Sequence, residues 1–61
     1  MSFHSLSPRE KQILKARGLG RLNKEISDNL GISINTVKHH LSSVFRKLEV
    51  SSSLEAVALL P

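Results

Sequence analysis

The segment from residue 23 to residue 38 constrains the fold of this 61-residue chain more than any other. Its first half places Ile26 and Leu30 one helical turn apart, as a helix with one buried face requires. Gly31 then supplies the left-handed conformation that commonly ends a helix, and Ser33 is a good cap for a second one. The segment therefore predicts two helices joined by a tight turn, which is the arrangement of a helix-turn-helix motif.

Length and composition limit what such a chain can be. Sixty-one residues allow one domain with a small core, because a chain of this size buries only about 60% of its unfolded surface. The chain has no cysteine, so it forms neither a disulfide nor a thiolate metal site. Nine Lys and Arg against five Asp and Glu give a formal net charge of +4, which favours a polyanionic partner such as nucleic acid. No apolar run is long enough to span a membrane, so we expect no membrane partner and a cytoplasmic location.

Caps and apolar spacing divide the chain into four predicted helices. Residues 1–5 are expected to be a flexible N-terminal tail, and residues 6–61 to form the domain. The first helix begins after Ser7, which has the spacing of a capping box with Glu10, and it ends near Gly18. The other helices are expected at about 23–30, 34–48 and 53–60, with the turn near 31–33. The predicted fold is a compact, all-α, four-helix domain that contains a helix-turn-helix.

The third predicted helix is apolar on one side and polar and basic on the other. Its apolar residues fall within an arc of about 100° and are Val37, Leu41, Val44, Phe45 and Leu48. A helix of this kind, presented by a preceding helix and a turn, is typical of proteins that read the major groove of DNA. Side chains near its N-terminal half reach base edges, so we expect base contacts from Lys38, His39 and Ser42. Flanking positions are expected to contact phosphates, namely Lys24, Asn35, Thr36, Arg46 and Lys47.

The histidines do not indicate a metal or catalytic site. His39 and His40 are adjacent on a helix and point about 100° apart, so they do not readily ligate one ion together. His40 lies at the edge of the apolar arc, where it is either a partly buried packing residue or a DNA contact. His4 falls in the expected tail. The chain also lacks a nucleophile elbow and a phosphate-cradling glycine loop, so we expect no enzyme, metal or cofactor.

Four blocks spread over residues 6 to 60 carry a family resemblance. The first is Leu6-Ser7-Pro8-Arg9-Glu10 followed by Ile13-Leu14, and the second is Gly20 followed by Asn23-Lys24-Glu25-Ile26. The third begins with Ile32-Ser33 and continues through Thr36-Val37-Lys38-His39-His40 to Val44, Lys47-Leu48 and Val50. The last is Leu54-Glu55-Ala56-Val57, which resembles the start of the family's fourth helix. Together they resemble the LuxR-type helix-turn-helix domain, also called the NarL/FixJ or GerE type. The resemblance implies a four-helix domain of a bacterial transcription regulator with its third helix in the major groove. It also implies base contacts from the same three residues that the helix geometry selects.

The resemblance further implies partners. Family members usually carry this domain at the C-terminus, behind a phosphorylated receiver or a small-ligand sensor. The resemblance therefore implies an N-terminal receiver or sensor domain in the full-length protein, with a receiver making it a response regulator. The fourth helix commonly mediates dimerisation, which fits its lack of charge after Glu55 and indicates Leu54, Val57, Ala58 and Leu60. The expected partners are double-stranded DNA with palindromic half-sites and a second copy of the chain.

The chain departs from the family pattern between its first two helices. Arg17 stands where an apolar core residue is usual, and we expect its stem to cover the core while its charge stays in water. Leu19, Arg21 and Leu22 also differ from the usual order, with Leu22 in place of a small capping residue, so the path of this loop stays open. Glu25 is expected to pair with a nearby cation.

Two other functions remain open at this point. Region 4 of a sigma factor shares the Leu-Ser-Pro-Arg-Glu opening and a Thr-Val-Lys recognition helix, although the fourth helix and His40 argue against it. A helical protein-interaction or dimerisation module would act through the fourth helix. Such a module would show no salt-dependent affinity for DNA.

Overall fold

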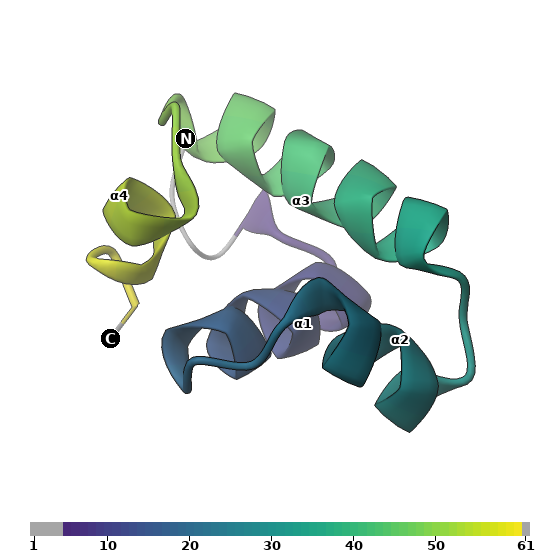
Figure 1. Ribbon diagram of the computed structural model, residues 1–61. Coiled ribbons are helices and arrows are strands. Elements are labelled where there is room, and N and C mark those ends of the chain that lie inside the picture. The colour runs from purple at the N-terminus through teal and green to yellow at the C-terminus, as the bar shows by residue number, and fades with distance from the viewer. Residues whose placement is uncertain (1–4, 61) are drawn as a thin grey trace.

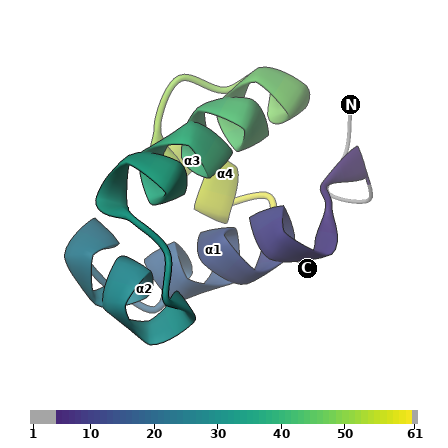
Figure 2. The same cartoon turned by 90° about the vertical axis from the view of Figure 1, so that its right-hand side faces the viewer.

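The computed structural model describes residues 5–60, which form four helices joined by short loops (Figure 1). The helices are α1 (Pro8–Gly18), α2 (Asn23–Leu30), α3 (Ile34–Leu48) and α4 (Ser53–Val57). The long helix α3 lies over α1 and α2, and α4 packs against α1 and the end of α3 (Figures 1 and 2). The all-α, four-helix prediction is confirmed, and α2 and α3 have the bounds expected from the sequence.

Some sequence predictions concern residues at the chain ends. Residues 1–4 and Pro61 lie outside the described part of the chain, and with them His4 and most of the expected tail. Ser5, the last residue of that tail, is described and exposed. Between residues 5 and 60, no helix combines the length and the apolar character that crossing a membrane requires.

The core consists of two neighbouring clusters of buried side chains. One joins α1, α2 and α3 through Ile13, Ile26, Val37 and Leu41. The other joins the N-terminal segment, α1, α3 and α4 through Leu6, Leu14, Val44, Leu48 and Ala56. The half-buried ring of Phe45 packs against both clusters. The apolar stripe of α3 therefore runs through the whole core, and every other helix covers a part of it.

Serine caps set the starts of three helices. The Oγ atoms of Ser7, Ser33 and Ser52 accept hydrogen bonds from backbone N–H groups three residues later, at 3.1, 3.0 and 3.2 Å. Each cap of this type stabilises a helix by about 1 kcal/mol. At the start of α2, Leu22 offers no side-chain acceptor. There the Oε1 atom of Glu25 accepts a hydrogen bond from the Leu22 N–H at 2.7 Å, so Glu25 caps the helix instead of pairing with a cation as predicted.

The turn between α2 and α3 has the geometry that the sequence predicts. Gly31 has φ 69° and ψ 32°, a left-handed conformation that a side chain would strain. The Ile32 N–H donates to the Ser27 carbonyl at 3.1 Å, which closes the end of α2. Ser27 is buried and small, and its hydroxyl donates to the Lys24 carbonyl at 2.8 Å. The chain can therefore reverse close to α2 without leaving these polar groups unpaired.

The fourth helix is shorter than predicted. It ends at Val57, whereas the sequence suggested a helix to about residue 60. Beyond Val57 the chain tightens, because the N–H groups of Leu59 and Leu60 donate to the carbonyls of Ala56 and Val57, three residues back, at 3.1 and 3.0 Å. This turn directs Leu60 onto the second core cluster, and its packing there replaces the last helical turn.

A buried ion pair ties the start of α1 to the end of α3. The Glu10 side chain is 5% exposed and its Oε1 accepts from Lys47 Nζ at 2.8 Å and from the Ser7 N–H at 2.7 Å. Burial alone raises the pKa of Glu10, but hydrogen bonds from Lys47, Ser43 and Ser7 and the charge of Lys47 outweigh it and lower that pKa to about 2. The carboxylate is therefore charged in the folded domain over the whole neutral range.

This ion pair predicts a pH-dependent stability. Because the folded pKa of Glu10 lies below the ordinary value of 4.5, its stabilisation is complete above about pH 4.5 and is lost as the pH falls towards 2. The size of the shift corresponds to a contribution on the order of 3 kcal/mol. Thermal unfolding of Glu10→Gln between pH 7 and 2 should show lower stability at pH 7 and a flatter pH profile. The exposed Glu49→Gln variant removes the same charge and should keep the wild-type profile. Equal pH profiles for Glu10→Gln and the wild-type domain would contradict the assignment.

The end of α3 predicts a stabilising substitution. Glu49 has φ 57° and ψ 44°, and a residue other than glycine in this region costs roughly 1–2 kcal/mol. Glycine removes that strain and loses part of the gain to the greater freedom of the unfolded chain, so Glu49→Gly should stabilise the domain by about 0.5–1 kcal/mol. Chemical denaturation measures the change. Glu49→Ala keeps the strained backbone and serves as the control, and an equal gain there would refute the explanation.

Candidate nucleic-acid interface

The outer face of α3 is open to solvent along its length. Val37, Leu41, Val44 and Leu48 are buried, which fixes the rotation of the helix. Lys38, His39 and Ser42, the three predicted base-contact residues, are all exposed, with His39 and Ser42 opposite the buried stripe and Lys38 on its flank. Packing of the apolar stripe thus brings these three side chains together on one accessible surface.

The first turn of α3 carries two of the predicted phosphate contacts. Asn35 and Thr36 are both exposed. The Thr36 N–H and hydroxyl are engaged by the Ser33 hydroxyl, at 3.0 and 2.9 Å. Thr36 therefore helps to hold the cap, and Asn35 is the side chain at this end that is free of the cap bonds.

Lys24 and Arg46, two further predicted phosphate contacts, are both exposed. Lys24 lies in the first turn of α2, and its Nζ is 3.3 Å from Asp28 Oδ2. The side chains of Lys24 and Asp28 are 73% and 69% exposed. A surface pair of this kind contributes only about 0.3–0.5 kcal/mol, so Lys24 can exchange Asp28 for a phosphate at little cost. Arg46 is exposed towards the C-terminal end of α3.

Lys47 is placed differently from the sequence prediction. Its Nζ is bound to the buried Glu10 carboxylate and its side chain is 32% exposed. Moving the ammonium to a phosphate would leave the Glu10 charge buried without its cation, which is strongly destabilising. The structure thus gives Lys47 a role in packing α3 on α1. Neither residue has a local sequence signal for this contact, since they are 37 positions apart.

The two histidines of α3 have different environments. His39 is exposed, whereas His40 is half-buried, and their ring centroids are 6.5 Å apart at an interplanar angle of 65°. His40 therefore lies at the edge of the exposed face, as expected. Among residues 5–60, no group of three or more His, Cys, Asp or Glu side chains is arranged to hold a metal ion.

A hollow beside the exposed face of α3 was not predicted from the sequence. It has a volume of about 320 Å³ and is lined by Arg17, Asn23, Lys38, Leu41, Ser42, Phe45 and Ser53. The Arg17 Nη1 donates to the Arg21 carbonyl at 2.7 Å, while its Nε is buried without a partner. Arg17 therefore does not simply extend its charge into water, as the sequence suggested, but ties the loop between α1 and α2 to α1.

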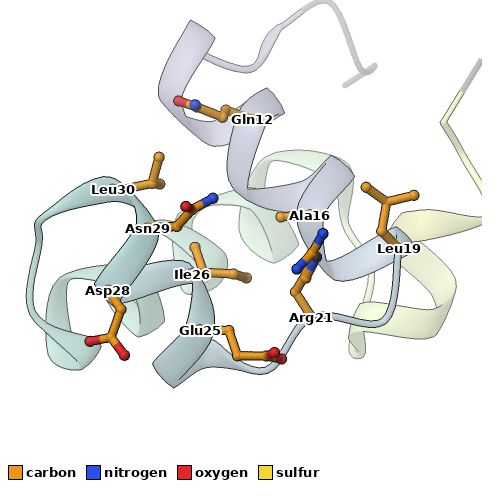
Figure 3. A pocket seen from close by; sticks show the side chains of 9 residues that line it. All are labelled: Gln12, Ala16, Leu19, Arg21, Glu25, Ile26, Asp28, Asn29 and Leu30. Carbon is orange, nitrogen blue, oxygen red and sulfur yellow. The ribbon is translucent and has the colours of Figure 1, made fainter.

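A second hollow lies between α1 and α2, and all its lining residues belong to these helices and their loop (Figure 3). It has a volume of about 370 Å³, with the apolar side chains of Ala16 and Ile26 among its walls. Unlike the hollow beside α3, it carries both signs of charge, because Arg21 and the carboxylates of Glu25 and Asp28 line it. This mixed charge makes it a poor site for a polyanion.

The predicted dimerisation residues divide into two groups. Leu54 is 81% exposed and Ala58 is exposed, so both are available to a partner. Val57 and Leu60 instead pack against the core, close to Gly18, where an added Cβ would lie 3.4 and 3.3 Å from them. Leu59, which was not among the predicted dimerisation residues, is 50% exposed. The exposed apolar residues of α4 and of the turn that follows it are therefore Leu54, Ala58 and Leu59.

Comparison with known proteins identifies the family of this domain. The family model described as bacterial regulatory proteins, luxR family, matches residues 4–60. The chain belongs to this family. The LuxR-type resemblance of the sequence is thereby confirmed, and it replaces the interpretation as region 4 of a sigma factor.

Individual relatives of this LuxR-family domain are transcriptional regulators. The chain is 46% identical over 56 residues to the putative HTH-type transcriptional regulator YhjB of Escherichia coli, covering 92% of the chain and 28% of YhjB. It is 44% identical over 56 residues to the transcriptional regulatory protein LiaR of Bacillus subtilis, covering 92% of the chain and 26% of LiaR. The chain thus spans about a quarter of the length of these relatives.

A solved structure shares the fold closely. It is the crystal structure of the anti-activator RapF complexed with the DNA-binding domain of the response regulator ComA. The match has a TM-score of 0.84 and 42% identity, and it covers 88% of this chain and 93% of the matched chain. The helical arrangement described above is therefore also that of a known DNA-binding domain.

Proposed function

We propose that this domain binds double-stranded DNA by placing α3 in the major groove, as the output domain of a transcription regulator. One observation carries the proposal: α3 has no Asp or Glu in its 15 residues, and its exposed polar side carries the cations Lys38 and Arg46. A helix of this kind fits the width of the major groove, and its positive charge attracts the phosphates on either side. Membership of the LuxR family and the ComA DNA-binding domain support the same function, and no catalytic role is proposed.

The contacts have two roles in this proposal. Lys38, His39 and Ser42 read base edges, because they share the exposed face towards the N-terminal half of α3. Phosphate contacts come from exposed residues around that face, which are Lys24, Asn35, Thr36 and Arg46, with His40 at its edge. Lys47 is left out of this set because Glu10 holds its ammonium.

The domain is further proposed to act as a homodimer within a longer, cytoplasmic protein. Leu54, Ala58 and Leu59 form the exposed apolar surface that a second copy would cover. Two-fold symmetry then implies palindromic half-sites spaced by about 34–36 Å or a multiple of it. Since the chain spans about a quarter of YhjB and LiaR and resembles the response regulator ComA, an N-terminal receiver or sensor domain is proposed for the full protein.

Protein docking is a second candidate function. The similar DNA-binding domain of ComA was solved in complex with the anti-activator RapF, so a domain of this fold does bind a protein partner. In this interpretation a bound protein partner excludes DNA from the domain, and bound DNA excludes the partner.

Substitutions should separate base reading from phosphate contact. Affinities would be measured for duplexes enriched from a random pool by the wild-type domain and for mixed-sequence duplexes. Lys38→Ala should lose roughly 1–3 kcal/mol of preference for the enriched duplex. Arg46→Ala should weaken binding to both duplexes alike and reduce the slope of log K against log salt by about one. Lys15→Ala, an exposed cation of α1, is the control. Equal effects of Lys38→Ala and Arg46→Ala on both duplexes would contradict the division of roles.

The apolar surface at α4 should control cooperativity. Leu54→Glu places a charge where the second copy would pack, so it should abolish cooperative binding to a duplex with two half-sites and leave binding to one half-site unchanged. Leu22→Glu is a control for the added charge, because Leu22 is an exposed leucine (63%) outside α4. Gel-shift titrations measure both quantities. Unchanged cooperativity in Leu54→Glu would rule out dimerisation through this surface.

A further inference from the structure

The hollow beside α3, called here the Arg17 hollow, adjoins the proposed DNA surface directly. Its walls come from the end of α1 (Arg17), the first residues of α2 and α4 (Asn23 and Ser53) and the side of α3. Lys38 and Ser42 belong both to this wall and to the exposed face of α3. Anything that lies along that face therefore passes the mouth of the hollow.

The charge of the Arg17 hollow suits an anion. Arg17 and Lys38 are its two charged lining residues, and none of the lining residues is acidic. The hollow between α1 and α2, by contrast, includes two carboxylates. The positive potential of the domain is thus extended from the face of α3 into this depression.

Two polar atoms of the Arg17 hollow lack the partners that buried atoms usually have. Arg17 Nε and Asn23 Oδ1 are both buried without a hydrogen bond, although both side chains line the same depression. Buried donors without partners are uncommon in native proteins. The Asn23 amide can also turn by 180°, which would present its NH₂ group as a second donor next to Arg17. Both side chains can therefore supply hydrogen-bond donors to an oxygen-rich ligand after a small side-chain adjustment.

We propose that the Arg17 hollow receives a backbone phosphate of the DNA strand that borders the groove occupied by α3, with Arg17 as an additional DNA-binding cation. The proposal rests on the proposed DNA-binding function and adds a contact to it. This contact would be particular to chains that carry a cation at the position of Arg17. Arg17 is suited to it because a guanidinium has five N–H donors, and the Arg21 carbonyl engages only one of its nitrogen atoms.

The competing explanation is purely structural. The hydrogen bond from Arg17 Nη1 to the Arg21 carbonyl fixes the loop between α1 and α2, and its loss would disturb the start of α2. Such a disturbance lowers DNA affinity without changing the number of phosphates that the domain neutralises. The salt dependence of binding separates the two explanations, because its slope counts those phosphates.

The test compares Arg17→Met with Lys15→Met on a mixed-sequence duplex, in KCl from about 50 to 200 mM. Both variants remove one positive charge from α1, but Lys15 does not line the Arg17 hollow. The slope of log K against log salt should fall by about 0.9 in Arg17→Met and should stay at the wild-type value in Lys15→Met. A wild-type slope in Arg17→Met, or the same decrease in both variants, would overturn the proposal.

A second pair of variants tests the hollow if Arg17→Met does not fold. Asn23→Asp places a carboxylate inside it, at a helix start where Asp is well tolerated. Asn29→Asp adds the same charge to the same helix but lines the hollow between α1 and α2. Asn23→Asp should weaken DNA binding several-fold more than Asn29→Asp, with both folds checked by amide NMR spectra. Equal weakening would refute a phosphate in the Arg17 hollow.

The wild-type domain shows which proposal has failed. If it binds the duplex with a salt-dependent affinity and the variants behave as their controls do, only the assignment of the Arg17 hollow is wrong. If the wild-type domain itself shows no salt-dependent affinity, the proposed DNA-binding function fails, and the contact proposed here fails with it.

Discussion

The one-sided apolar stripe of α3 is the constraint on which the rest of the structure depends. Val37 and Leu41 hold the cluster shared with α1 and α2, while Val44 and Leu48 hold the cluster shared with α1 and α4. Burial of each such side chain contributes roughly 1.5–3 kcal/mol, which is large for a domain with so small a core. All the other helices must cover the same side of α3. The exposed polar side, which carries Lys38 and His39, is therefore a direct result of how the core is packed.

The Glu10–Lys47 ion pair completes this arrangement at one end. It connects the first turn of α1 with the last turn of α3, and the Ser7 N–H shares the same carboxylate oxygen. The pair also affects where positive charge remains available. Lys47 is neutralised at the C-terminal end of α3, whereas Lys38 nearer the N-terminal end has no acidic residue on its own helix. The positive charge of the exposed side of α3 therefore comes from Lys38 and Arg46.

The sequence predicted the parts of the structure that depend on neighbouring residues. Ser7 and Ser33 mark helix starts through bonds to the N–H three residues later, and Gly31 marks a helix end through its left-handed backbone. Periodicity likewise identified which side of α3 is buried. Contacts between distant segments were not predictable in this way. Lys47 finds Glu10 across 37 positions, and no spacing rule indicates such a pair.

The distinction between local and long-range contacts also explains why the predicted dimerisation residues and the predicted length of α4 differ from the structure. Val57 and Leu60 have the composition expected of a dimer surface, but the bare Cα of Gly18 leaves room for them to pack on α1 instead. The helix end at Val57 follows from that packing and not from a local stop signal. The candidate surface on α4 could therefore be located from the sequence, but the side chains that remain exposed on it could not.

The loop between α1 and α2 shows how a domain of this family can vary next to its binding surface. Its backbone is held by hydrogen bonds from the Arg17 guanidinium to the Arg21 carbonyl, from the Arg21 N–H to the Ala16 carbonyl at 3.2 Å, and from the Leu22 N–H to Glu25. All three use only backbone atoms of the loop residues themselves, with the partner supplied by a flanking helix. The side chains of Leu19, Arg21 and Leu22 are consequently exposed and free to differ from the usual family pattern. Because Arg17 both holds this loop and lines the hollow beside Lys38, a change of residue there would alter the loop and the charge next to the proposed DNA surface together.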